Sequence, residues 1–238
     1  MNKCVIPISG GLDSTVILHD ITNSKLYDEV HAITFDYGQR HKREIDCAKW
    51  QAQRANVTSH KILDISFFKE LSNISSLTNS SIDVANTRDI LGDPQTVNYV
   101  PFRNQLLLTI CCSYAESIGA STVYHGAAMV DSQAGYWDGS EEFLDSMNSL
   151  LLLNRRHTIK IEAPLICKDK SDIIRLGVKH RVDFKNTYTC YSGEELSDAE
   201  NPASSSRIHG FLQAGYIDPI PYKQDIPWSQ WNCKPIKT

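Results

Sequence analysis

Seven consecutive residues near the start of the chain combine two glycines with hydroxyl and carboxylate side chains: Ser9, Gly10, Gly11, Leu12, Asp13, Ser14 and Thr15. They separate an apolar run from an amphipathic one, so we expect them to form a turn between a strand and a helix. Two glycines let the backbone approach an anion without a Cβ clash. The start of a helix adds unsatisfied N–H groups and the positive end of the helix dipole. The combination favours a phosphate-binding turn.

A purely structural role is the alternative for this turn, with Asp13 or Ser14 merely capping the helix. The serine before the glycines and the Asp-Ser-Thr run after them favour phosphate binding instead. The turn matches neither the Gly-x4-Gly-Lys-Ser/Thr loop of P-loop NTPases nor the Gly-x-Gly-x-x-Gly fingerprint of dinucleotide-binding proteins.

The rest of the chain alternates short β-branched runs with amphipathic segments. We expect strands at residues 4–8, 30–35, 60–65, 122–126 and 159–161, and helices at residues 15–21, 45–55 and 103–118, the last ending at Gly119. This alternation predicts an α/β fold with a mainly parallel, five-stranded sheet covered by helices on both faces. Ligands of such sheets bind beyond the carboxyl ends of the strands, where residues 9–15, 35–41 and 126–136 would meet.

Two segments fall outside the alternation. Residues 72–98 are rich in Ser, Asn and Asp and are long for a connection, as is typical of a lid or a binding loop. From about residue 188 onward, frequent Pro and Gly and little periodicity predict an irregular C-terminal extension. We therefore divide the chain into an α/β domain at 1–187, which holds the phosphate-binding turn and the long loop, and an extension at 188–238 packed on it.

Composition narrows the functional class. The 238 residues are 41% hydrophobic and 22% charged, with a formal net charge of −4, which suits a globular protein and argues against a broad nucleic-acid-binding face. Seven scattered cysteines without a Cys-x-x-Cys pair indicate reduced thiols in a cytoplasmic protein. No apolar run approaches the roughly 20 residues that span a bilayer, so we expect no membrane association.

The turn at residues 9–14 resembles the Ser-Gly-Gly-x-Asp-Ser pyrophosphate loop (PP-loop) of the ATP pyrophosphatase superfamily. Further segments occur in the order seen in 7-cyano-7-deazaguanine synthases: FDYGQRH (35–41) with Glu44, VPFRN (100–104), YWD (136–138), APL (163–165) with Lys170, TYTCY (187–191), GF (210–211), AG (214–215) and DP (218–219). This resemblance spans nearly the whole chain. It implies an adenine nucleotide alpha hydrolase-like, Rossmann-like fold.

The resemblance also implies an activity, a C–N ligase reaction in queuosine biosynthesis. Members of the family adenylate 7-carboxy-7-deazaguanine with ATP and Mg²⁺, release pyrophosphate, and use ammonia to form an amide. A second activation dehydrates that amide to the nitrile preQ0. Relatives tend to be homodimers, so the resemblance implies a homodimer here.

The family's chemistry suggests roles for individual residues. Catalysis is assigned to Asp13 of the loop and to Arg103 and Lys170. Joining a carboxylate to a phosphate needs positive charge, which Arg103, Lys170 and Arg40 would supply. Nucleotide binding is assigned to residues 9–15 and Arg40. The substrate is assigned to Tyr37, Asn104, Asp131, Tyr136 and Asp138, the aspartates accepting from the amino and ring N–H groups of a guanine-like base. His41 and His125 are more often ordinary polar residues than catalysts.

The chain also departs from the family pattern. Members carry a zinc site made by the cysteine of the Thr-x-Ser-Cys-Tyr segment and a Cys-x-x-Cys-x-x-Cys run just before the Gly-Phe pair. Here Cys190 is present, but residues 198–206 contain no cysteine. Serine hydroxyls are poor zinc ligands, so we expect no zinc and no metal-ligating residues. We expect Trp228, Trp231 and the C-terminal prolines to replace the lost cross-link by packing. The family's Tyr-Pro-Asp-Cys-Arg run reads Tyr-Trp-Asp-Gly-Ser at residues 136–140, which leaves the product open.

Several alternatives remain at this point. The enzyme could stop at the amide, or it could transfer the adenylated acid to an amine of a protein partner. A PP-loop enzyme that modifies tRNA is another class, which the net charge and the missing Cys-x-x-Cys disfavour. A non-catalytic nucleotide-binding module is a third, which the intact Ser9, Asp13 and Ser14 disfavour.

Overall fold

The computed structural model describes residues 1–39, 43–79, 81–83, 97–129, 131, 136–189 and 196–236. In this part of the chain five strands form one sheet in the order β3-β2-β1-β4-β5, and every neighbouring pair is parallel. The strands are β1 (Lys3–Pro7), β2 (Glu29–Asp36), β3 (Ser59–Asp64), β4 (Thr122–Tyr124) and β5 (Lys160–Glu162). The predicted parallel five-stranded sheet is confirmed.

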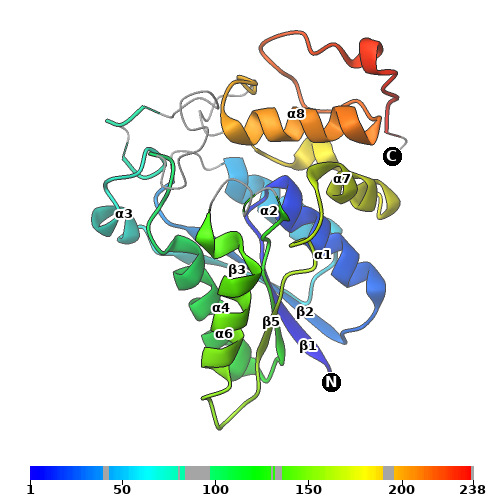
Figure 1. The fold of residues 1–238 in the computed structure, drawn as a ribbon. Coiled ribbons are helices and arrows are strands. Elements are labelled where there is room, and N and C mark those ends of the chain that lie inside the picture. Colours follow the sequence, from blue (N-terminus) through cyan, green and yellow to red (C-terminus); the bar gives the residue numbers. More distant parts are fainter. Residues whose placement is uncertain are drawn as a thin grey trace.

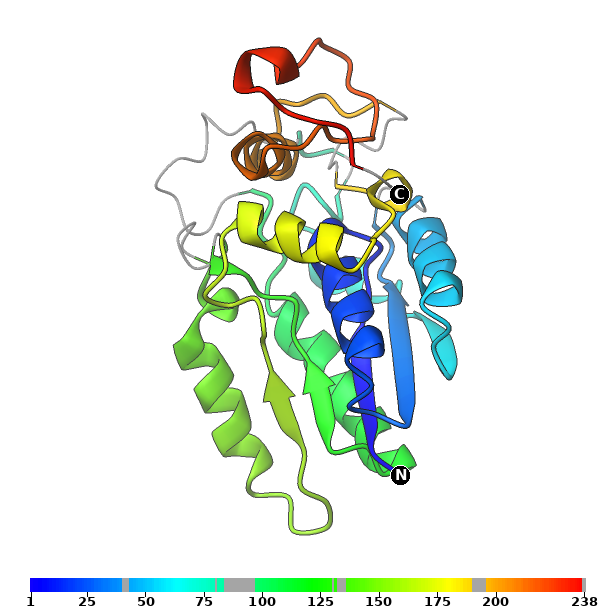
Figure 2. The ribbon, with the colours of Figure 1, turned by 90° about the vertical axis from the view of Figure 1, so that its right-hand side faces the viewer.

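Helices lie on both faces of the sheet (Figures 1 and 2). One face is covered by α1 (Leu12–Ser24), α2 (Arg43–Arg54) and α7 (Lys170–Lys179), and the other by α4 (Arg103–Ile118) and α6 (Glu141–Leu151). Alternate residues of β1 supply the two cores. Cys4 and Ile6 are buried on the α1 side and Val5 on the α4 side, as expected for a strand covered on both faces.

Short elements complete the described fold: α3 (Phe68–Leu71), η2 (Trp137–Gly139), η3 (Phe184–Asn186) and η4 (Trp228–Trp231). The helix α4 ends where its sequence predicts, because Gly119 takes up a left-handed conformation with φ +72°. Two helices that sequence analysis did not identify, α6 and α7, begin at side-chain caps. The Ser140 hydroxyl accepts from the amide of Phe143, and the Asp169 carboxylate accepts from the amide of Asp172.

The C-terminal extension, expected to be irregular, contains the 13-residue helix α8 (Pro202–Ala214). Asn201 caps this helix, and Pro202 occupies its first turn, where a missing N–H costs nothing. The helix escapes a search for apolar periodicity because its buried face consists of Ser204, Arg207, Gly210 and Phe211. Only one of these four is a large apolar residue.

The long polar loop at residues 72–98 is described only in part. Its described residues are pinned by buried polar contacts: the Ser76 hydroxyl donates to Oδ1 of Asn98 at 2.6 Å, and the Ser76 amide donates to the carbonyl of Val97 at 2.7 Å. Among the helices that the structure describes, none is long and apolar enough to cross a membrane.

Candidate active site

The predicted phosphate-binding turn lies where the strand order of the sheet reverses. β1 pairs with β2 on one side and with β4 on the other, so the helices that follow these strands leave on opposite faces. Ligands of open parallel sheets bind at such a switch point, beyond the carboxyl ends of the strands. The turn between β1 and α1 occupies this position (Figure 2).

Glycine is required in the turn for two reasons. Gly10 has φ +82°, which other residues rarely adopt. A Cβ atom at this position would lie 2.1 Å from the carbonyl oxygen of Glu44 and 2.8 Å from the amide nitrogen of Ala48. The turn is therefore pressed against the start of α2, and a side chain at Gly10 would force the two apart.

Most of the turn's amides remain available to an anion. The Ser9 amide donates to the Ser14 hydroxyl at 3.2 Å, and the Gly11 amide donates to the Ser9 hydroxyl at 3.1 Å. Within the described ranges, no acceptor contacts the amides of Gly10, Leu12, Asp13 and Ser14. Four free donors at the start of α1 form the kind of site that binds phosphate oxygens.

Three predicted site residues meet beside the turn. Nζ of Lys170, at the start of α7, lies 2.7 Å from each carboxylate oxygen of Asp13, at the start of α1. Asp131 accepts from the Ala128 amide at 2.9 Å. Burial and the charge of the nearby Asp13 carboxylate raise the pKa of Asp131 to about 6, and the Lys170 ammonium opposes this rise. Above about pH 6 the Asp131 carboxylate therefore adds a negative charge near the Asp13–Lys170 ion pair.

A second group of predicted residues forms on the α2 and α4 side. The Arg103 guanidinium donates to the Tyr37 hydroxyl at 3.4 Å and lies over the Tyr37 ring, 5.6 Å from its centroid. Burial raises the pKa of Glu44 to about 7 against the opposing charge of Arg103. The Glu44 carbonyl contacts the turn at Gly10, so this group adjoins the phosphate-binding turn. Arg40 lies outside the described residues.

Two of the remaining predicted substrate residues, Tyr136 and Asp138, lie in or beside an aromatic cluster. The rings of Tyr136 and Tyr99 stack with centroids 6.4 Å apart, and Nε1 of Trp137 donates to the Tyr99 hydroxyl at 2.9 Å. Asp138 is buried, and its carbonyl accepts from Nε2 of His125 at 2.9 Å. Asn104 is half-buried next to Arg103 at the start of α4.

Sequence analysis missed the most strongly held side chain of the C-terminal extension. Arg207 of α8 is 1% exposed and forms a two-point ion pair with Asp218, at 2.6 and 2.9 Å. It also donates to the hydroxyls of Thr187 and Thr189, at 2.8 and 3.0 Å. An arginine in a polar run gives no sign of burial. Of the residues that contact Arg207, Asp218 was singled out in the sequence, as part of the Asp-Pro pair at 218–219.

The segment that would carry the zinc cysteines holds a hydrogen-bonded polar cluster. Asp198, Asn201 and Ser204 follow one another at the three-residue spacing of Cys-x-x-Cys-x-x-Cys. The Asn201 amide group donates to Asp198 at 2.7 Å and to the Ser204 hydroxyl at 3.0 Å. Asn201 and Ser204 are buried. An amide and a hydroxyl that are bonded to each other do not fit a thiolate zinc site. Cys190 lies outside the described residues.

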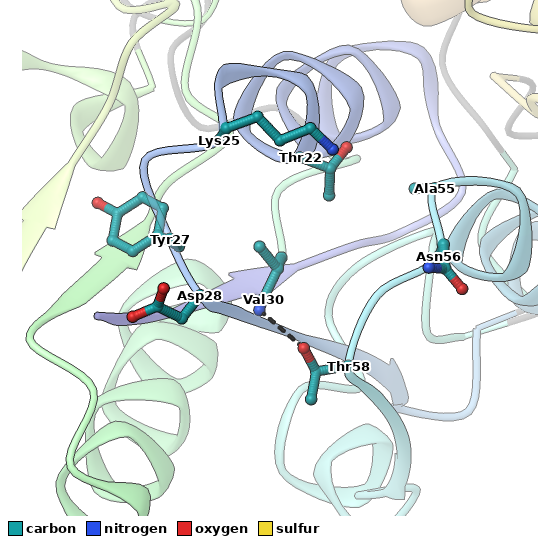
Figure 3. A pocket seen from close by; sticks show the side chains of 8 residues that line it. All are labelled: Thr22, Lys25, Tyr27, Asp28, Val30, Ala55, Asn56 and Thr58. Carbon is teal, nitrogen blue, oxygen red and sulfur yellow. Dashed lines mark hydrogen bonds between the residues drawn. The ribbon is translucent and has the colours of Figure 1, made fainter. Parts of the chain in front are cut away.

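A separate hollow of about 180 Å³ lies at the opposite, amino edge of the sheet (Figure 3). It is lined by Thr22, Lys25, Tyr27, Asp28, Val30, Ala55, Asn56 and Thr58. The Val30 amide donates to the Thr58 hydroxyl across its floor at 3.1 Å. Because this hollow adjoins the starts of β2 and β3, it is remote from the phosphate-binding turn.

Solved structures of PP-loop-like proteins share the fold. NMN synthetase from Francisella tularensis aligns with 97% of this chain and 83% of its own, with a TM-score of 0.52 and 14% identity. The U34-tRNA thiolase NcsA from Methanococcus maripaludis aligns with 77% of this chain and 59% of its own, with a TM-score of 0.50 and 15% identity. At these identities the likeness concerns the fold alone.

Sequence comparison identifies closer relatives. The profile of the family described as "Queuosine biosynthesis protein QueC" matches residues 3–215. The 7-cyano-7-deazaguanine synthase of Oceanobacillus iheyensis is 40% identical over 222 residues, covering 92% of this chain and 98% of the relative. The 7-cyano-7-deazaguanine synthase of Thermoplasma volcanium is 38% identical over 230 residues, covering 93% of this chain and 91% of the relative. Because the family model spans most of the chain and these relatives are aligned over nearly their whole length, the chain belongs to the 7-cyano-7-deazaguanine synthase family.

Proposed function

We propose that the protein is an ATP-dependent ligase that converts 7-carboxy-7-deazaguanine and ammonia to the 7-cyano product, with the 7-amido compound as its intermediate or end product. The observation that carries the proposal is the turn at residues 9–15, whose four free amides lie beside the Lys170 ammonium at the sheet's switch point. This combination suits a departing pyrophosphate. Family membership supplies the class of substrate.

The proposed chemistry proceeds by two activations. A carboxylate oxygen of the substrate attacks the α-phosphorus, the bond to the β-phosphate breaks, and pyrophosphate leaves into the turn. Ammonia then attacks the acyl carbon, loses a proton, and displaces AMP. A second ATP activates the amide oxygen in the same way, and loss of AMP and two protons gives the nitrile.

Side chains of the protein would neutralise charge during these steps and bind the base. Lys170, held by Asp13, and Arg103, next to the turn, supply the positive charge that offsets the approach of two anions. Asp131 is ionised above about pH 6, so it can accept hydrogen bonds from the N–H groups of the base. Tyr136 and Tyr99 offer a stacked aromatic surface to a flat ring.

Further features of the proposal follow from the family. Mg²⁺ would accompany ATP. The described residues include no group of three or more His, Cys, Asp or Glu side chains placed to hold an ion, so the phosphate oxygens would supply most of its ligands. A cytoplasmic homodimer, the use of ammonia, and the division into a domain at 1–187 and an extension at 188–238 remain predictions.

Oxygen labelling of the substrate tests the proposed reaction. The acid carrying two ¹⁸O atoms in its carboxylate should be incubated with the protein, ATP and ammonium and analysed by mass spectrometry. Formation of the nitrile should give two AMP molecules with one ¹⁸O each, whereas stopping at the amide should leave one ¹⁸O in that amide. Unlabelled AMP, or no conversion at saturating substrate, would refute the ligase assignment. A reaction without ATP is the control.

We also propose that the protein folds without zinc. Asn201 and Ser204, at two of the positions where the family pattern has cysteines, are hydrogen-bonded to each other and offer no thiolate ligand. Metal analysis of purified protein should find far less than one zinc per chain. The triple variant Asp198→Cys, Asn201→Cys, Ser204→Cys restores the cysteine spacing beside Cys190 and should gain zinc, which makes it a positive control. One tightly bound zinc in the unaltered protein would contradict the proposal.

A further inference from the structure

The helix α8 lies on the carboxyl side of the sheet and packs on α7 (Figures 1 and 2). Arg207 and Gly210 are three residues apart and therefore share one face of this helix. Both are directed at segments that touch the phosphate-binding turn. The C-terminal extension thus reaches the turn by two routes that are independent of each other.

The first route runs through Gly210 to Lys170. A Cβ atom at Gly210 would lie 2.4 Å from Cγ and 2.9 Å from Cβ of Lys170, so only glycine lets the stem of this lysine pass beneath α8. The stem leads to Nζ, which bonds both carboxylate oxygens of Asp13. Lysine side chains otherwise sample many rotamers, and the Lys170 side chain is only 13% exposed. Contact with α8 therefore restricts where the ammonium group can lie.

The second route runs through Arg207 to the backbone of the turn. Nη1 of Arg207 donates to the hydroxyls of both Thr187 and Thr189. The residue between them, Tyr188, donates its amide to the carbonyl of Gly10 at 2.9 Å. The Asp218 carboxylate holds the guanidinium in place. Arg207 thereby fixes the segment that anchors the turn.

We infer that Gly210 and Arg207 are positioning residues of the active site. Through Gly210, α8 keeps the Lys170 ammonium next to Asp13. Through Arg207, α8 keeps the residue 187–189 segment hydrogen-bonded to the turn at Gly10. The effect of these residues on catalysis rests on the proposed function. Their effect on the position of Lys170 and of the turn does not depend on that function. Among the described residues, the Arg207 side chain has no hydrogen bond to residues 9–15 themselves. Gly210 and Arg207 act through residues that do bond the turn: Lys170, which donates to Asp13, and Tyr188, which donates to Gly10.

The variant Gly210→Ala tests the first route. Its methyl group must displace the Lys170 stem, and a displacement of about 1 Å at a reacting group can lower kcat by about 10- to 100-fold. The matched control is Gly177→Ala on α7. A Cβ atom there would meet Phe184 at 2.4 Å and Val16 at 2.9 Å, so it creates an equally severe clash in the core without touching Lys170.

Two measurements are made on wild type and both variants. The first is the NMR signal of the Lys170 ammonium in ¹⁵N-lysine-labelled protein, assigned by its loss in Lys170→Arg. We expect it to shift or disappear in Gly210→Ala and to persist in Gly177→Ala. The second is kcat for AMP release, which should fall further in Gly210→Ala than in Gly177→Ala at equal thermal stability.

The outcomes separate this inference from the proposed function. An unchanged Lys170 signal in Gly210→Ala, or equal changes in both variants, would overturn the positioning role. A signal that changes only in Gly210→Ala, in a protein whose wild type makes no AMP, would support the structural part and refute the ligase assignment instead.

Discussion

Replacing Asp13 by asparagine should lower kcat for AMP release by about 100- to 1000-fold, the usual effect of removing one electrostatic contact to a transition state. The Asp13 carboxylate receives two charge-assisted hydrogen bonds from Lys170. Asparagine keeps the shape but presents one neutral oxygen and an NH₂ group that faces the ammonium. Lys170 would then leave its position beside the turn. Turnover is measured as AMP formed per enzyme at saturating ATP and acid.

The same helix supplies a control for this substitution. Asp20, also on α1, lies 2.9 Å from Nε2 of His180, in a pair about as buried as Asp13–Lys170, and among the described residues its side chain has no contact with residues 9–15. Asp20→Asn should therefore leave AMP release within about two-fold of wild type, because it alters a similar pair on the same helix without disturbing the turn or Lys170. Circular dichroism should show both variants folded. An Asp13→Asn protein that turns over at the wild-type rate would refute the assignment of this loop.

Replacing Arg207 by methionine should destabilise the protein by about 3–5 kcal/mol, because the substitution leaves the negative charge of the Asp218 carboxylate buried without a positive partner. The Arg207 and Asp218 side chains are 1% and 0% exposed. The Tyr222 hydroxyl at 2.7 Å and the Ile220 amide at 3.2 Å still donate to Asp218, but neither neutralises its charge. The measurement is urea unfolding, in which the midpoint should fall at an unchanged slope.

Two further variants isolate the cause of this loss. Arg175→Met removes an arginine of α7 that pairs with Asp172 and donates to the Gln213 carbonyl of α8; its ion pair is half exposed, so we expect a loss of about 1 kcal/mol or less. In the double variant Arg207→Met, Asp218→Leu no charge is left buried, so most of the stability should return. If Arg207→Met cost no more than Arg175→Met, the buried pair would not be what holds the extension.

The features that the sequence predicted correctly depend on local patterns. Each strand coincides with a β-branched run, and α4 stops at Gly119, where a left-handed residue is required. The turn at residues 9–15 combines two glycines with hydroxyl and carboxylate side chains, a combination that is rare outside phosphate-binding turns. It lies between β1 and α1, as predicted. In each case the information sits within a few neighbouring residues, so it can be read without knowledge of the tertiary contacts.

The missed features depend on contacts between distant segments. Arg207 is buried only because Asp218, Thr187 and Thr189 converge on it, and no local pattern announces that convergence. The Asp13–Lys170 pair joins residues 157 positions apart. The family resemblance named both residues, but their contact depends on the packing of α7 against α1. Gly210 was marked only as part of the Gly-Phe pair of the family pattern. Its contact with the Lys170 side chain depends on how α8 packs on α7, so the sequence did not show it.

In the proposed reaction the turn at residues 9–15 receives pyrophosphate from ATP when the deazaguanine acid is activated. Exchange of radiolabelled pyrophosphate into ATP, without ammonia, measures this step directly. We predict exchange that requires the acid and the wild-type turn and that is lost in Asp13→Asn. If the acid binds and no label enters ATP, or if label enters ATP equally well without the acid, the proposal is contradicted.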